Sequence, residues 1–313
     1  MNGRVIDTSP LAARPAAGRR QRSDGRLPRP WLAPYLFPAL VVAGALLVYP
    51  LVQLARMSVS DVGTTTLISA WELVGLENFG AVLNDAAFWN AAKVTALLTA
   101  VLLVVDLIIG FVAALALTGR GRLIGATLSL LVFVWTLPPL VSGSVWKFLL
   151  SGDGGVNAAL GMVGLGPVDW LSSPSVALWS VSLVAAWASL PFAILIIRGG
   201  LMSIPPDVLE AAALDGANAW QRATRVILPL LRPTLAVLTI LLILYAFGSF
   251  NFVYVLTGGG PGDTTNILPF LAYQTAFRTY SFDLASAIAV LSMVVVLVLS
   301  VPYVLGVRKE QAA

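Results

Sequence analysis

Cysteine and histidine are absent from this sequence of 313 residues, and charged residues are scarce. Without cysteine the chain has no disulfide framework, no thiolate nucleophile and no cysteine metal site. Without histidine it also lacks the commonest general base, the commonest metal ligand and the usual serine-hydrolase triad. We therefore expect neither an enzyme nor a metal site.

Charged side chains make up 11% of the residues, whereas ordinary soluble domains carry roughly 25%. Hydrophobic residues account for 58%, and the mean hydropathy is +0.89. The formal net charge of +4 is small and dispersed among apolar runs, so we expect no nucleic-acid partner. This composition is typical of a membrane protein that moves, holds or senses something.

Six apolar runs are long enough to span a membrane, because a hydrocarbon core of about 30 Å needs roughly 20 apolar residues. They are residues 31–54, 91–117, 123–149, 176–197, 234–256 and 284–307. Each run is predicted to be helical, since an unpaired backbone amide in lipid costs several kcal/mol. The predicted fold class is all-α, with six transmembrane helices in a permease domain over residues 31–307.

Lys and Arg residues are distributed unequally between the two predicted sides. One side holds the basic tail of residues 1–28, residues 120–122, residues 198–232 and the C-terminus at 308–313. The other side holds only Arg56, Lys93, Lys147 and Arg278. Because cytoplasmic loops carry the excess of basic residues, both termini are predicted to be cytoplasmic. The tail is expected to be disordered; its charge either attracts anionic membrane lipid or simply sets the topology.

The segment between the fourth and fifth runs, residues 203–229, is too long for a minimal loop. Asp207, after two prolines, is typical of a helix start. An alanine-rich helix over 208–214 is followed by a turn at Asp215 and Gly216, since glycine accepts positive φ without steric cost. A second helix over 217–227 is predicted to end at Pro229. The sequence thus predicts a helix-turn-helix segment on the cytoplasmic side.

The string EAAALDGANAWQRATRVILPLLRP, residues 210–233, resembles the EAA loop of ABC-transporter permeases. That motif has Glu-Ala-Ala, then Gly, then Ile-Leu-Pro, and here the Glu, Gly and Pro are Glu210, Gly216 and Pro229. The strings YPLVQLARMSVSD, GLENFGAVLND, GGVNAALG, NFVYVLTGGGPGDTTN and SFDLASAIAV are similar to the carbohydrate branch of that family, the maltose and glycerol-phosphate type. The resemblance extends from about residue 31 to the C-terminus.

The resemblance implies that this segment is a coupling helix seated in a groove of a cytoplasmic ATPase. The implied coupling residues are Glu210, Ala211, Ala212, Asp215, Gly216 and Pro229. The alanines add little bulk, and Glu210 can pair with a neighbouring arginine such as Arg222 or Arg225. The alternative is a soluble helical hairpin with a solvated Glu.

The resemblance further implies a bacterial cytoplasmic-membrane importer of sugars assembled from several chains. Its other parts would be a second related permease subunit, two copies of the ATPase and an extracytoplasmic sugar-binding protein. ATP and Mg would be bound by the ATPase, and this chain would bind no cofactor. The rival class is an ion-coupled secondary transporter, which predicts paired intramembrane charges and an inverted repeat.

Polar and aromatic residues within the spans are the candidates for a substrate path. Asp106 is the only acid deep in a predicted span, where it either lines a cavity, contacts another helix or is a packing acid paired nearby. The fifth span contributes Tyr245, Phe247, Ser249, Phe250 and Asn251, and the fourth contributes Trp187 and Ser189. Aromatic faces with amides and hydroxyls suit sugars, although the same rings could fill space between helices.

Prolines inside the spans are predicted to break or kink them, because proline lacks an amide hydrogen and clashes one turn back. They are Pro138 and Pro139 in the third span and Pro191 in the fourth. Residues 258–261, Gly-Gly-Gly-Pro, have no following lysine and are not a P-loop. They form either a flexible turn or a contact for an external binding protein.

Overall fold

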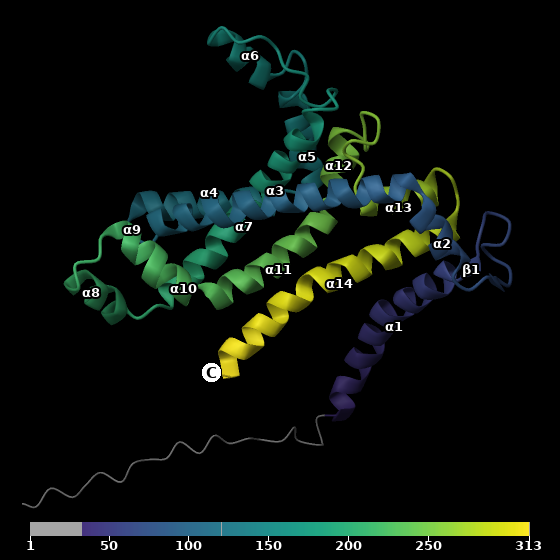
Figure 1. Cartoon of the computed structure of the whole chain (residues 1–313), viewed down its shortest axis with the longest axis horizontal. Coiled ribbons are helices and arrows are strands. Elements are labelled where there is room, and N and C mark those ends of the chain that lie inside the picture. Colours follow the sequence, from purple (N-terminus) through teal and green to yellow (C-terminus); the bar gives the residue numbers. More distant parts are fainter. Residues whose placement is uncertain (1–32, 120, 313) are drawn as a thin grey trace, which may run out of the picture. The chain divides into compact units, whose positions relative to one another are not determined.

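The computed structural model describes residues 33–119 and 121–312, with side chains between residues 37 and 301. Helices make up almost all of its elements, so the all-α class is confirmed (Figure 1). The strands β1 Ser60–Asp61 and β2 Glu72–Leu73 form one small antiparallel pair, with Ser60 opposite Leu73. Residues 33–50 form one unit and the chain from residue 51 a second. The predicted tail of residues 1–28 lies outside the described residues.

Five helical segments are long and apolar enough to cross a membrane. They are α1 Ala33–Ser58, α3 Ala86–Ala116, α7 Ala177–Met202, the consecutive helices α11 Arg232–Gly248 and α12 Phe250–Leu256, and α14 Phe282–Ala312. The sixth predicted span is a bent pair, α4 Arg122–Thr136 and α5 Pro139–Leu149, whose axes differ by 98°. The six predicted apolar runs thus correspond to five spanning segments and one broken one.

The proline pair breaks the third span where the sequence predicted it. Leu137 and Pro138 have extended backbones, with ψ angles of 131° and 132°. Pro191 does not break its helix, because α7 continues from Ala177 to Met202 with Pro191 inside. One missing amide is tolerated in a helix held by neighbouring helices, whereas two consecutive prolines remove two amides and disfavour the helical region at both Leu137 and Pro138.

The apolar core lies among α3, α7, α11 and α12. Its fully buried side chains include Leu98, Leu102, Ile197, Leu242 and Phe252. The helices α3 and α7 form the most extensive contact between elements. Asp106 contacts Ser189, and a Cβ at Gly110 would meet Ala193. In each pair the two residues are 83 positions apart in sequence, so the two helices run parallel in a constant register.

Three short helices join or flank these spans. They are α2 Glu77–Asn84, α6 Gly155–Met162 and α13 Leu268–Phe277. A second apolar cluster joins α2, α3, α13 and α14 through Val82, Phe88, Ala91, Leu268 and Ile288. The short helices therefore extend the packing beyond the central four helices.

The segment between α7 and α11 is a helix-turn-helix, as the sequence predicted. The first helix, α8 Pro206–Leu214, ends at Asp215, and Gly216 has a φ of 79°. The second begins two residues later than predicted, where Asn218 and Gln221 form a capping box. It comprises α9 Ala219–Gln221, the π-helix η2 Arg222–Ile227 and α10 Leu228–Leu230. Pro229 lies inside α10 rather than after it, because its first-turn position needs no amide hydrogen.

Candidate functional site

A buried carboxylate joins two of the spans within the core. Asp106 in α3 is 0% exposed, and the hydroxyl of Ser189 in α7 donates a hydrogen bond of 2.5 Å to its Oδ2. Its Oδ1 is buried and has no hydrogen-bond partner. Tyr245 in α11 packs against the same apolar core. Two predicted residues from two helices therefore come together, and the fully buried Asp106 lines no open cavity here.

The five candidates of the fifth span are separated by a helix break at Ser249. Ser249 is 2% exposed, and its hydroxyl donates to the carbonyl oxygen of Tyr245 at 3.0 Å. Phe247 packs with the second apolar cluster, next to Leu268. Phe250 packs against Tyr273, with ring centroids 5.1 Å apart, and Asn251 is half-buried. The break thus directs these side chains toward different neighbours rather than onto one surface.

Trp187 lies in an apolar pocket that is separate from the Asp106 carboxylate. The volume of this pocket is about 380 Å³, and its walls come from α5, α6, α7 and the chain before α7. Four tryptophans line it, namely Trp146, Trp170, Trp179 and Trp187. The rings of Trp146 and Trp187 meet edge to face with centroids 5.3 Å apart. The sequence analysis missed three of these rings, because only the fold brings residues so distant in sequence together.

Asn157 holds the segment that supplies Trp170. Its Oδ1 accepts hydrogen bonds from the Trp170 indole N–H at 2.9 Å and from the Val168 amide at 3.1 Å. Its Nδ2 donates to the carbonyls of Ser151, Gly152 and Val168. This side chain is 7% exposed and fully bonded. It belongs to the GGVNAALG string, in which no local pattern indicates this role.

Most of the predicted coupling residues are exposed. They are Glu210, Ala211, Asp215 and Gly216, while Ala212 and Pro229 are half-buried. A Cβ built at Gly216 meets no atom within 4 Å. Two large apolar side chains beside them, Leu214 at 90% and Trp220 at 75%, are also exposed. We call Glu210, Ala211, Leu214, Asp215, Gly216 and Trp220 the segment surface.

The expected ion pair of Glu210 with Arg222 or Arg225 is wrong for the described part of the chain, where no such contact is present. Glu210 is exposed on α8, and the Nε of Arg222 is buried without a hydrogen-bond partner. Both arginines lie on η2, beyond the turn at Gly216 and the capping box of Asn218 and Gln221.

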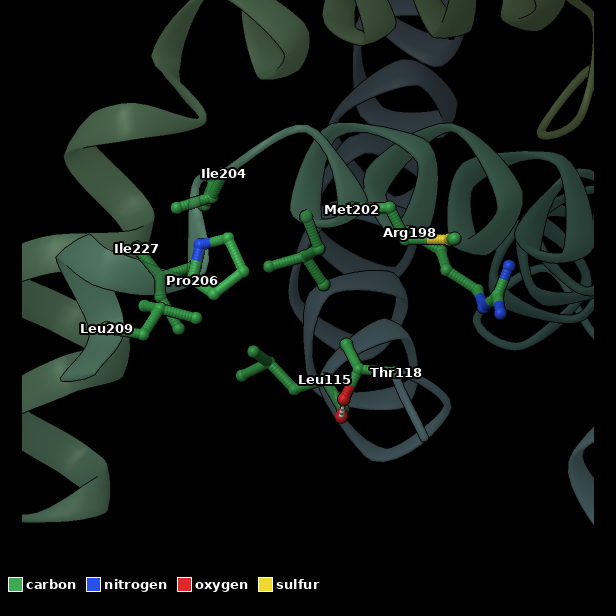
Figure 2. Close-up of a pocket in the computed structure, with 9 residues that line it drawn as sticks. Leu115, Thr118, Arg198, Met202, Ile204, Pro206, Leu209 and Ile227 are labelled. Carbon is green, nitrogen blue, oxygen red and sulfur yellow. Dashed lines mark hydrogen bonds between the residues drawn. The ribbon is translucent and has the colours of Figure 1, made fainter. Parts of the chain in front are cut away.

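A pocket of about 390 Å³ lies where α3, α7, α8 and η2 come together (Figure 2). Its lining residues are Leu115, Thr118, Arg198, Leu201, Met202, Ile204, Pro206, Leu209 and Ile227. Arg198 also donates from Nε to the carbonyl oxygen of Leu117 at 2.9 Å. The sequence analysis used Arg198 only to orient the chain.

Comparison with known proteins identifies the family of this chain. The family model for the binding-protein-dependent transport system inner membrane component matches residues 106–307. The trehalose/maltose transport system permease protein MalF of Thermococcus litoralis is 32% identical over 86% of this chain and 90% of its own length. The diacetylchitobiose uptake system permease protein DasB of Streptomyces coelicolor is 33% identical over 94% of this chain and 92% of its own length.

A solved structure shares the fold. It is a bacterial ABC transporter involved in the import of the acidic polysaccharide alginate, with a TM-score of 0.75, 22% identity, and coverage of 89% of this chain and 96% of that one. The family match spans most of the region from α3 to α14. The chain therefore belongs to the binding-protein-dependent transport system inner membrane components, the multi-pass permease subunits of ABC transporters.

Proposed function

We propose that this chain is the permease subunit of an ATP-driven, binding-protein-dependent sugar importer, and that it forms half of the translocation path. The observation that carries the coupling part of this proposal is the segment surface on α8 and α9. Its large apolar side chains, Leu214 and Trp220, are mostly exposed. Exposed apolar side chains that cluster on a surface mark interaction sites. The relatives named for trehalose, maltose and diacetylchitobiose support sugar as the substrate class.

The partner of the segment surface is proposed to be a separate ATPase present in two copies, which binds ATP and Mg. Leu214 supplies apolar area for docking, and Trp220 adds the exposed part of an indole that also lines a pocket with Phe111 and Val112 of α3. Gly216 leaves its backbone open to close approach. A second related permease and an extracytoplasmic sugar-binding protein complete the assembly, with both termini in the cytoplasm.

The substrate path is proposed to follow the bent third span and the fifth span, which is interrupted at Ser249. The second halves of these spans pack together, since a Cβ at Gly143 in α5 would lie 3.4 Å from Val255 in α12. Discontinuous helices commonly bound transporter sites, because their free backbone groups can bind substrate. Trp187, beside α5, and Asn251, just after the break at Ser249, are the proposed sugar contacts.

The deciding experiment measures sugar uptake by the assembled transporter in proteoliposomes loaded with ATP. We expect uptake that needs ATP, the ATPase and the binding protein, and that persists when ionophores dissipate all ion gradients. Uptake that continues without ATP and follows an imposed ion gradient would contradict the importer and support the secondary transporter.

Replacement of Asp106 by Asn also distinguishes the ATP-driven importer from the ion-coupled secondary transporter. The introduced amide keeps an acceptor for the Ser189 hydroxyl but cannot ionise, so the contact between α3 and α7 is retained. For the importer we expect Asp106→Asn to change the uptake rate by less than about twofold, since most well-accommodated substitutions cost little. An ion-coupled carrier that used this carboxylate would lose uptake altogether.

A further inference from the structure

Arg198, near the C-terminal end of α7, holds the C-terminal end of α3. Its Nε donates to the carbonyl oxygen of Leu117, the residue that caps α3, across 81 positions in sequence. The last carbonyls of a helix lack partners within that helix, and a positive charge there is also favoured by the helix dipole. The guanidinium therefore binds the end of α3 by a hydrogen bond and by its charge.

The last turn of α3 faces α8 across the 390 Å³ pocket rather than packing tightly against it. Figure 2 shows Leu115 of α3 and Thr118, just after the end of α3, apart from Pro206 and Leu209 of α8. By contrast, only residues 203–205 separate α7 from α8 along the chain. A displacement of α8 thus reaches α7 directly through the backbone, and α7 passes it to α3, against which it packs extensively. The helices α9 and η2 also face α3, across a second pocket.

Three of the contacts between α3 and α7 are spread along the length of the two helices. Asp106 accepts from Ser189, and Gly110 permits the close approach of Ala193 and Ile197. Arg198 makes the third contact, and it is the one nearest to α8. Removing it would leave the two deeper contacts to hold α3 against α7 alone, so the two helices could separate from this end.

We propose, resting on the function proposed above, that Arg198 is a positioning residue that makes α3 move with α7 when the ATPase displaces α8. The guanidinium transmits the displacement across the pocket to the end of α3. In its absence α8 moves α7 alone at this end, so the two spans separate and ATP is hydrolysed without a matching movement of the path.

The test compares sugar imported per ATP hydrolysed by the complete transporter in proteoliposomes. Arg198→Met keeps an apolar stem in the pocket but has no donor, and we expect this ratio to fall about tenfold with ATPase activity retained. Arg198→Lys is expected to give an intermediate ratio, because the ammonium can donate but lacks the planar fork. Arg232→Met, at an exposed arginine that begins α11, is the matched control and should leave the ratio unchanged.

A disulfide between α3 and α7 provides a rescue that a merely structural role would not predict. The chain contains no cysteine, and the Cβ positions of residues 110 and 193 are 3.4 Å apart, close to the roughly 3.5–4.5 Å of disulfides. In Arg198→Met carrying Gly110→Cys and Ala193→Cys, oxidation should restore the ratio and reduction should abolish it again. If Arg198→Met does not assemble, the same cysteine pair is tested in Arg198→Lys.

A wild-type ratio in Arg198→Met would overturn the proposal, as would a ratio that stays low after oxidation of the cysteine pair. If the proposed function itself were wrong, the result would differ from both of these outcomes, because the wild-type assembly would show no ATP-dependent import at all. The two proposals are therefore tested separately in one set of proteoliposomes.

Discussion

Replacement of Gly216 by Val is expected to abolish import and to weaken ATPase association at least about tenfold, since interface anchors and their close contacts carry most of the binding energy. Gly216 has a φ of 79°, where a β-branched residue is strained, and no atom lies within 4 Å of an added Cβ. The new side chain would therefore project outward into the space that the ATPase is proposed to occupy. Co-purification of the ATPase and uptake in proteoliposomes measure the two effects.

The matched control is Gly164→Val, because Gly164 has a φ of 78° and equally open space around its Cβ. Both variants carry the same backbone strain, of about 1–3 kcal/mol, so membrane insertion and thermal stability should change alike. ATPase association should fall only in Gly216→Val. Equal association in both variants would show that the turn touches no partner.

Replacement of Asn157 by Leu is expected to destabilise the segment between α5 and α7 by about 3 kcal/mol or more, because each unsatisfied buried polar group costs about 1–3 kcal/mol. The indole N–H of Trp170 and the amide of Val168 would lose their acceptor, and three carbonyls would lose a donor. Limited proteolysis of the purified chain should then cut within residues 151–176, and the fluorescence of Trp170 should shift toward that of exposed tryptophan.

Asn84→Leu is the control for this change. Asn84 is exposed and makes one side-chain hydrogen bond, to the carbonyl oxygen of Gly80 at 2.9 Å. Its replacement should cost less than about 1 kcal/mol, as expected for surface sites. If Asn157→Leu resisted protease as well as Asn84→Leu does, the bonds of Asn157 would not be what holds this segment.

The sequence was sufficient for features that depend on local chemistry. Apolar length located the spans, the Pro138–Pro139 pair located the bend, and Gly216 located the turn, since each effect acts on the backbone of neighbouring residues. The break at Ser249 was not predicted, because no proline marks it and the flanking residues continue the apolar pattern.

Features that depend on tertiary packing were beyond the sequence. Asp106 and Ser189 were both candidates, but their hydrogen bond joins residues 83 positions apart and follows from the register of α3 and α7. The four tryptophans of the apolar pocket and the contact of Arg198 with Leu117 arise in the same way. The predicted ion pair of Glu210 failed because an exposed pair gains too little free energy to orient two helices.

The most direct test of the central claim is a cross-link from the segment surface in the assembled transporter. The chain has no cysteine, so Asp215→Cys provides one defined site for a photoactivatable label. Our account predicts that the label cross-links to the ATPase and that the ATPase protects this cysteine from aqueous maleimide. Rapid maleimide labelling in every nucleotide state, with no cross-link to another subunit, would contradict it.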